Sequence, residues 1–178
     1  MTHRTMRKKR ASSIVAKFAA GIGQDSHRFE RRRSAKPLVL AGVKIPGCPG
    51  LDGNSDADVV LHAVTNAVSG ITGVNILGPV ADRMCLDRGI RDSGAYLAKA
   101  MEAMGSWRLC HVSVSIEAKR PRLVGHLRDM RASLARLCSL PIDEIGIAAT
   151  SGEGLTAFGK GLGIQAFAVV TAQRSGRR

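Results

Sequence analysis

Residues 54–62 read Asn-Ser-Asp-Ala-Asp-Val-Val-Leu-His. We predict that a helix begins here, because Ser55 can accept hydrogen bonds from the free N–H groups of the first turn and Asp58 completes a pair resembling a capping box. Asp58, His62 and Asn66 follow one another at intervals of four, so they line one face of that helix. A polar stripe of this kind either faces water or lines a site.

A segment upstream favours the second reading. Residues 21–29 read Gly-Ile-Gly-Gln-Asp-Ser-His-Arg-Phe, which puts Asp25 and His27 two positions apart. In an extended strand these two side chains point to the same side. With His62 they would supply one carboxylate and two imidazoles, a set that suits zinc with a fourth position open for substrate.

Composition bounds the fold class. The chain has 178 residues, of which 44% are hydrophobic, enough for one domain with a substantial core. No apolar run is long enough to cross a bilayer. The four cysteines share no C-x-x-C spacing, which predicts reduced thiols in a cytosolic-type compartment rather than disulfides or a zinc knuckle.

The net charge of +13 is concentrated at the two ends of the chain. Six basic residues lie in the first twenty positions and three in the last five, and neither stretch contains an acid. The first twenty residues read as a frayed basic extension or as an organelle transit peptide. Aromatic residues are 3% and residues 31–33 form the only internal basic run, so a nucleic-acid partner is unlikely and a phosphorylated substrate accounts equally well for the charge.

Strand and helix patterns are mixed along the chain without a repeat, which predicts an α+β fold with helices packed against one sheet. Residues 70–92 are punctuated by Gly and Pro and read as a mobile surface loop. The expected elements are a strand at 15–24, a strand pair at 36–45, the helix from Ser55, a helix at 92–104 capped by Asp92 or Ser93, a strand at 112–118, a helix at 122–137, a strand at 143–149 and a last strand at 164–172.

One segment resembles a nucleotide-binding motif without meeting its requirements. Residues 154–161 read Gly-Leu-Thr-Ala-Phe-Gly-Lys-Gly, one residue away from a nucleotide-binding Walker A loop. Position 161 lacks the hydroxyl that would bind Mg²⁺, and the segment after it looks like a strand, so no helix N-terminus is available for phosphates. We therefore reject nucleoside triphosphate hydrolysis.

Two other segments each allow two readings. Residues 150–153, Thr-Ser-Gly-Glu, form either an ordinary turn or a phosphate contact through Thr150 and Ser151 with Glu153 as ligand of a hard cation. Residues 119–123, Lys-Arg-Pro-Arg-Leu, form either a solvated basic turn or part of a binding site.

In the order 25–29, 55–63, 118–123 and 149–153, these motifs resemble the 2-C-methyl-D-erythritol 2,4-cyclodiphosphate synthases of the non-mevalonate isoprenoid pathway. The resemblance runs from about Gly21 to Ala172. It divides the chain into a basic extension (1–20), a cyclodiphosphate-synthase-like domain (21–173) and a basic tail (174–178). It implies a bacterial cytoplasmic enzyme, or a plastid one if the N-terminus is a transit peptide.

The resemblance implies a two-layer sandwich, with one mixed sheet and helices on one face, assembled as a homotrimer with active sites between subunits. The reaction would convert a CDP-linked methylerythritol 2-phosphate to the cyclic diphosphate and release CMP. One zinc per subunit would be bound by Asp25, His27 and His62. The substrate would be contacted by Asn54, Ser55, Asp58 and Gly78, with Ala118, Pro121, Arg122 and Leu123 around the cytidine. The catalytic residues would be Thr150 and Ser151 near the phosphates and Glu153 holding a second cation, Mg²⁺ or Mn²⁺.

The chain also departs from the family pattern. Ile76 stands where the family has the Asp that holds the ribose hydroxyls, so ribose recognition would need Asn75 or another group. The other departures are Asn54 for His, Asn66 for Asp, Arg122 for Lys, Thr156-Ala157 for Gly-Phe and Lys160 for Arg. We expect a divergent but active enzyme; the alternatives are an inactive member that serves as a binding or scaffold protein, and a basic RNA-associated protein.

Overall fold

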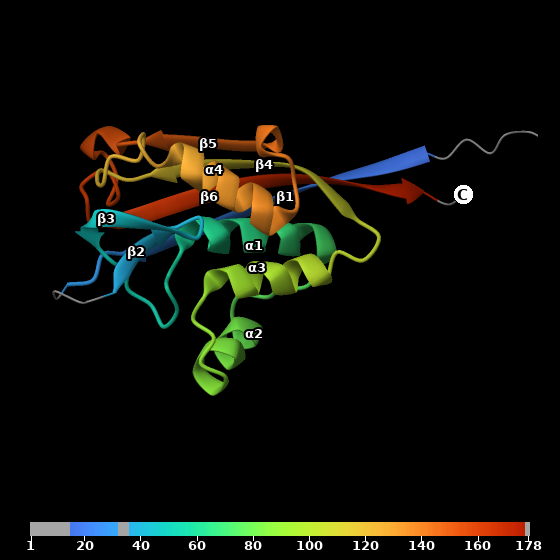
Figure 1. Ribbon diagram of the computed structural model, residues 1–178, viewed down its shortest axis with the longest axis horizontal. Coiled ribbons are helices and arrows are strands. Elements are labelled where there is room, and N and C mark those ends of the chain that lie inside the picture. Colours follow the sequence, from blue (N-terminus) through green and yellow to red (C-terminus); the bar gives the residue numbers. More distant parts are fainter. Residues whose placement is uncertain (1–14, 32–35, 177–178) are drawn as a thin grey trace, which may run out of the picture.

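The computed structural model of the chain describes residues 15–31 and 36–176. A four-stranded mixed sheet in the order β1-β6-β4-β5 forms its centre (Figure 1). The neighbours β1 and β6 pair antiparallel, as do β6 and β4, whereas β4 and β5 pair parallel. The strands span Val15–Arg28 (β1), Arg108–Glu117 (β4), Ile145–Thr150 (β5) and Gly163–Gly176 (β6).

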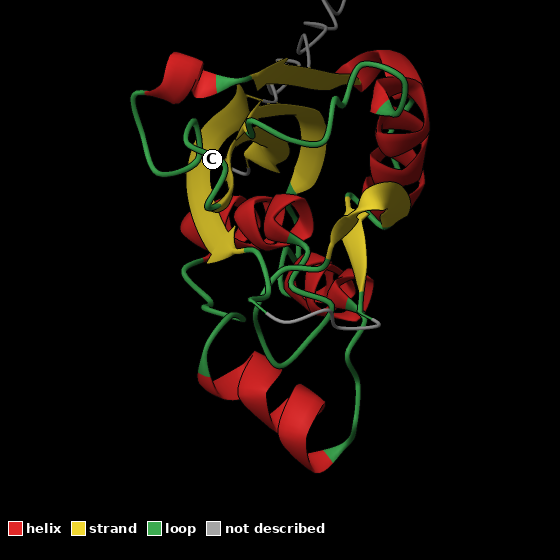
Figure 2. Ribbon diagram, turned by 90° about the vertical axis from the view of Figure 1, so that its left-hand side faces the viewer, coloured by secondary structure: helices red, strands yellow, loops and turns green. Residues whose placement is uncertain are grey.

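A separate hairpin of β2 (Pro37–Leu40) and β3 (Val43–Pro49) confirms the predicted strand pair. The helices cover one face of the sheet, as predicted. Figure 1 shows α1 between the sheet and α3, with α2 farthest from the sheet, and Figure 2 shows the segment containing α2 projecting from the body. The helices span Val59–Thr72 (α1), Pro79–Asp82 (α2), Ser93–Glu102 (α3) and Leu127–Cys138 (α4).

Two glycines of β1 let α1 pack directly on the sheet. A Cβ on Gly21 would lie 2.0 Å from the carbonyl oxygen of Ala67, and one on Gly23 would lie 2.0 Å from that of Ala63. Because side chains alternate along a strand, Asp25 and His27 continue the same face toward α1. Close packing at the glycines therefore brings the polar end of β1 up to the helix.

The helices do not cover the opposite face of the sheet, where large apolar side chains are exposed beside polar ones such as Gln24 and Ser113. Phe18 and Ile22 of β1 are 74% and 71% exposed, and Phe167 and Val169 of β6 are 44% and 43% exposed. We call these four residues the apolar sheet face. An exposed cluster of large apolar side chains of this kind is a candidate interaction surface.

The predicted start of α1 was wrong by one turn. The helix begins at Val59, and its cap is Asp58, whose carboxylate accepts from the backbone N–H groups of Val60 and Leu61 at 3.0 Å each. Ser55 instead accepts from the N–H of Ala57 at 3.0 Å, outside the helix. The positive φ of 55° at Ala57 separates this turn from the helix.

Other boundaries also differ. The expected loop at 70–92 contains α2 and a π-helical turn (Arg83–Asp87), and the helix predicted from 122 begins at Leu127. Residues 15–20 pair with residues 171–176 in the sheet, so part of the expected basic extension and part of the expected basic tail are β-strand. Residues 1–14, most of the basic run at 31–33, and residues 177–178 lie outside the described residues.

Three expectations about composition and motifs can be compared with the fold. After the Walker-like segment the chain enters β6 at Gly163, without a helix, as predicted. In the described ranges no helix is both long and apolar enough to cross a membrane. The four cysteines are free thiols, and burial raises the pKa of Cys138 to about 12.

Candidate functional site

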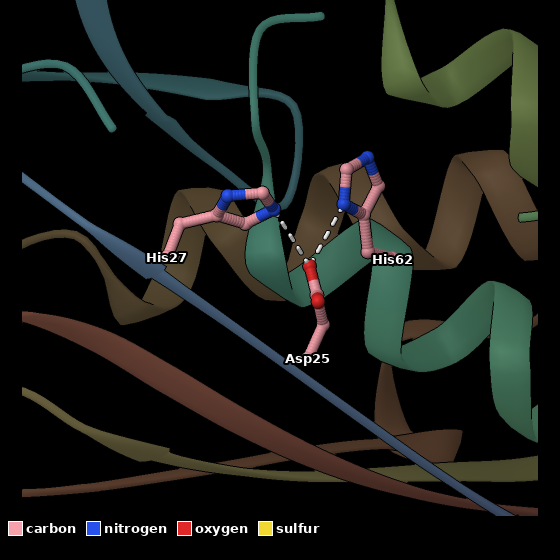
Figure 3. A group of neighbouring side chains, drawn as sticks. All are labelled: Asp25, His27 and His62. Atoms are coloured by element: carbon pink, nitrogen blue, oxygen red, sulfur yellow. Dashed lines mark hydrogen bonds and ion pairs between the residues drawn. The ribbon is translucent and has the colours of Figure 1, made fainter. Parts of the chain in front are cut away.

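Three of the predicted ligands converge at the end of β1. The Oδ2 atom of Asp25 lies 3.1 Å from His27 Nε2 and 2.8 Å from His62 Nδ1 (Figure 3). One ligand atom from each residue lies within 4.8 Å of the other two. We call Asp25, His27 and His62 the metal cluster. The strand places two of its members on one face, and the helix packed on that face supplies the third.

Hydrogen bonds within the metal cluster favour the charged forms of Asp25 and His27. Burial acts to raise the pKa of Asp25, but the hydrogen bonds with His27 and His62 outweigh it and hold that pKa well below its ordinary value. The hydrogen bond with Asp25 raises the pKa of His27, although burial of the ring opposes this shift. The carboxylate is thus ionised at neutral pH and surrounded by groups that can carry a positive charge.

The metal cluster fits a small divalent cation. The Oδ2 atom of Asp25 faces one nitrogen of His27 and one nitrogen of His62. Oxygen and nitrogen lone pairs repel each other, so either a proton or a cation must lie in each of these contacts. One carboxylate and two imidazoles are ligands that zinc accepts, and three protein ligands leave a position open for another molecule. His62 is only 8% exposed, so the ligand position left open for another molecule faces the adjoining cavity.

The second ring nitrogen of His62 reaches into the core. Its Nε2 lies 2.9 Å from the hydroxyl of Ser93, which donates a short hydrogen bond to Asp56 Oδ1. The backbone N–H of Ser93 also donates to Asp56 Oδ2, at 3.1 Å. Sequence analysis singled out Ser93 only as a possible helix cap, and that role belongs to Asp92, which accepts from Gly94 N.

The first cavity, of about 300 Å³, opens beside the metal cluster. It is lined by the predicted residues Asn54, Ser55 and Gly78. Asp58 does not line it, because its buried carboxylate accepts from four backbone N–H groups, two of them from the turn at Ala41 and Gly42. The remaining lining residues were not predicted from the sequence: Gly53, Leu77, Ala81, Asp82, Cys85 and Tyr96.

The second cavity, of about 490 Å³, lies where β4 and β5 end. The structure brings together here all six residues that the resemblance placed around the cytidine and phosphates, although Arg122, Thr150 and Ser151 are exposed. These residues are Ala118, Pro121, Arg122, Leu123, Thr150 and Ser151. Glu153 lies just outside and accepts from the Ser151 hydroxyl at 2.9 Å, with φ of 48°.

The two cavities lie at opposite edges of the sheet. The first adjoins β1 and the second adjoins β5, and these are the two outer strands of the four. Three strand spacings separate them, or about 14 Å across the sheet. A single subunit therefore does not join them into one pocket.

The structure shows the surroundings of three of the departures. Ile76 is 3% exposed and belongs to the hydrophobic core, so it presents nothing to the first cavity. Thr156 donates a short hydrogen bond to Glu117 and accepts from Gly159 N at 2.9 Å, which ties its loop to the end of β4. Asn66 donates to the Gln24 carbonyl at 3.2 Å.

Residues 18–173 match the YgbB family. The chain is 48% identical over 155 residues to the 2-C-methyl-D-erythritol 2,4-cyclodiphosphate synthase of Chlamydia caviae, which covers 86% of this chain and 88% of that protein. A solved 2C-methyl-D-erythritol-2,4-cyclodiphosphate synthase in a CDP-bound form superposes with a TM-score of 0.74 and 37% identity, covering 86% of this chain and 99% of the other. The bifunctional IspDF from Campylobacter jejuni superposes with a TM-score of 0.81 and 26% identity over 90% of this chain, which spans 43% of that longer protein.

Proposed function

The chain belongs to the YgbB family, and from this premise we propose that it converts 4-diphosphocytidyl-2-C-methyl-D-erythritol 2-phosphate to 2-C-methyl-D-erythritol 2,4-cyclodiphosphate with release of CMP. It would thus act as a phosphorus-oxygen lyase. One observation carries the proposal: the metal cluster converges at the mouth of a cavity lined by Asn54 and Ser55, in a chain closely similar to enzymes named for this product.

The reaction requires that the two phosphates of the substrate are held in the right orientation and that their negative charge is neutralised. An oxygen of the 2-phosphate bonds to the β-phosphorus, the bond from that phosphorus to the oxygen bridging the α-phosphate breaks, and the electron pair leaves with CMP. The nucleophile is already ionised, so no general base is needed. Holding both phosphates in one cleft can lower the barrier by roughly 7–11 kcal/mol.

Asp25, His27 and His62 would hold one zinc ion per subunit. Zinc bound there would act as a Lewis acid on the β-phosphate. The low pKa of Asp25 keeps this ligand ionised, as metal binding requires. Ser55 already accepts from the Ala57 N–H, so its hydroxyl proton is free to donate to a phosphate oxygen.

The second cavity would receive the cytidine and the neighbouring phosphate. Pro121 and Leu123 offer apolar surface to the base, and the hydroxyls of Thr150 and Ser151 can donate to phosphate oxygens. Glu153 would hold a second divalent cation, Mg²⁺ or Mn²⁺. A single carboxylate fits this role, because Mg²⁺ commonly takes one or two carboxylates and completes its shell with waters and substrate phosphates.

Asp82 is our candidate for the ribose contact. Ile76 is buried, and Asn75 is not among the residues that line the first cavity. Asp82 lines that cavity together with Gly78, and its carboxylate can accept from two hydroxyl groups. Replacing it by Asn should weaken CMP binding about tenfold, since a hydrogen bond to a charged group contributes about 1.5–3 kcal/mol; unchanged affinity would remove Asp82 from this role.

A homotrimer would join the two cavities. In a closed ring each subunit offers one edge to its neighbour's opposite edge, so the first cavity of one copy can meet the second cavity of the next. The apolar sheet face, with Phe18, Ile22, Phe167 and Val169, would be covered in such an assembly. The named relatives are bacterial, which favours a cytoplasmic enzyme over a plastid one.

The trimer can be tested with Ile22→Asp, which places a charge on the apolar sheet face without touching either cavity. We expect a monomer in analytical ultracentrifugation, with the zinc content of the unaltered protein and almost no turnover. The matched control is Lys44→Asp, which makes a larger charge change at another exposed strand position. A fully active monomer would overturn the shared-site proposal.

The alternative function is a family member that binds ligands without turnover. The experiment that decides is incubation of the zinc-loaded protein with the CDP-linked substrate and Mg²⁺ or Mn²⁺, with CMP measured by chromatography and the cyclic product by phosphorus NMR. Equal amounts of CMP and cyclic diphosphate are expected. Substrate binding without either product would establish the binding function instead.

A further inference from the structure

His62 is the member of the metal cluster whose orientation depends on other side chains. His27 directs its other ring nitrogen to the backbone of Asp52. His62 instead places Nε2 at 2.9 Å from the hydroxyl of Ser93, a residue with no exposed surface. Ser93 is in turn bound twice to Asp56, by its hydroxyl and by its backbone N–H.

Counting protons along this chain settles the direction of each hydrogen bond. The carboxylate of Asp56 only accepts, and besides Ser93 it receives the Asp58 N–H at 3.2 Å. A serine hydroxyl has one proton, and the short bond to Asp56 uses it. The oxygen of Ser93 can then only accept from His62, so Nε2 carries a proton. Nδ1, which lies 2.8 Å from Asp25 Oδ2, would present its lone pair when a cation lies between the two atoms.

We infer that Ser93 and Asp56 are positioning residues for metal binding, which hold His62 in the tautomer and ring orientation that aim Nδ1 at the ion. The inference rests on the proposed metal site. It assigns a task to a buried serine and a half-buried aspartate, neither of which lines the first or the second cavity. Hydrogen-bond partners of this kind usually change metal affinity by about 10- to 100-fold when they are removed.

The test is zinc affinity, measured by competition with a chromophoric chelator. Ser93→Ala removes the hydroxyl and keeps the backbone N–H bond to Asp56, and Asp92 still caps α3. We expect zinc to bind about 10- to 100-fold more weakly. The matched control is Ser69→Ala on α1, which removes another buried serine hydroxyl, one without a hydrogen-bond partner among the described residues, and should leave zinc affinity unchanged.

Asp56→Asn separates hydrogen-bond direction from simple packing. The new amide can donate to Ser93, which frees the hydroxyl proton to point at His62 Nε2 and favours the proton on Nδ1, where it blocks the metal. A variant of nearly identical size should therefore lose at least as much zinc affinity as Ser93→Ala. If Asp56→Asn binds zinc as tightly as the unaltered protein, the proton count is wrong and the inference falls.

A measurement on the unaltered, zinc-loaded protein needs no variant. Nitrogen-edited NMR should detect a slowly exchanging His62 Nε2–H proton protected by Ser93, and Ser93→Ala should make it exchange rapidly.

His62→Ala separates the proposed metal site from the proposed positioning roles of Ser93 and Asp56. If His62→Ala keeps its zinc, the metal site itself is wrong; if it loses zinc while Ser93→Ala and Asp56→Asn keep full affinity, only the positioning roles are wrong.

Discussion

The metal cluster and the second cavity are built in opposite ways. Asp25 and His62 lie on a strand and a helix packed face to face through glycines, and both His62 and its partner Ser93 are buried. The second cavity is formed by turns after β4 and β5, and Thr150 and Ser151 at its rim are exposed. One region is fixed by the core of a single subunit, and the other is left open at an edge.

The difference matches what each region has to bind. Metal ligands must meet within a fraction of an ångström, which only a packed scaffold maintains. The proposed Mg²⁺ beside the second cavity would need few protein ligands, because this ion keeps several waters and takes substrate phosphates into its shell. We therefore expect substitutions in the metal cluster to cost more than equivalent ones in the second cavity.

The largest effect should come from His62→Ala. Loss of one of three protein ligands should leave little bound zinc, and loss of a Lewis acid that contributes several kcal/mol should lower kcat/KM by at least about a thousandfold. Metal analysis and the CMP-release assay measure both. His111→Ala is the control, because His111 is a half-exposed histidine of β4 that pairs with Glu144 and lies outside the metal cluster. If His62→Ala retained its zinc, His62 would not be a metal ligand and the expected sensitivity of the metal cluster would be wrong.

The next largest effect should come from Ile76→Asp, on stability rather than on the site. Restoring the family carboxylate at this position would bury it in the core, because Ile76 is 3% exposed. We expect the free energy of unfolding to fall by about 2–5 kcal/mol, against about 0.5–1.5 kcal/mol for the control Ile76→Val. Denaturant unfolding measures both. An Ile76→Asp protein of normal stability that bound CMP more tightly would contradict the buried position.

The contrast between the regions also explains what the sequence could predict. The shared direction of Asp25 and His27 follows from strand alternation, and an α+β fold with helices packed against one sheet follows from the order of patterns along the chain. The mixed sheet with helices on one face came from the resemblance to the family. The start of α1 could not be predicted, because Ser55 and Asp58 are equally good caps and only the contact of Asp58 with the hairpin at Ala41 and Gly42 decides between them.

Residues that act through tertiary contacts were missed for the same reason. Ser93 lies 31 positions from His62 and carried only a helix-cap signal. Asp82 lay in a segment that read as a loop, because a four-residue helix is too short to show a period. The pairing of residues 174–176 with residues 15–17 was missed, because the predicted last strand ended at residue 172 and Arg174 was assigned to a basic tail.

A smaller effect is expected from Glu153→Gln in the loop beside the second cavity. Removing the charge that would hold the second cation should lower turnover by about 100-fold, because one well-placed electrostatic contact contributes about 2.7–4 kcal/mol in such sites. Zinc content and melting temperature should not change, since Glu153 is exposed. The control is Glu102→Gln, an exposed glutamate paired with Lys99 on α3. Parental turnover in Glu153→Gln would remove the second-cation role.

The smallest effect should come from Arg122→Lys, which restores the residue usual in the family. Arg122 is exposed, so its charge is screened, and an exposed ionic contact contributes about 0–1 kcal/mol. We expect the CMP dissociation constant to change by less than about threefold in calorimetry, and Arg122→Ala to weaken binding by about fivefold, less so at high salt. If Arg122→Lys instead costs tenfold or more, then the guanidinium makes a geometrically fixed, two-pronged contact that an ammonium cannot reproduce. The second cavity would then demand the same precision as the metal cluster, and the edge of the subunit would have to be ordered by its neighbour before the nucleotide binds.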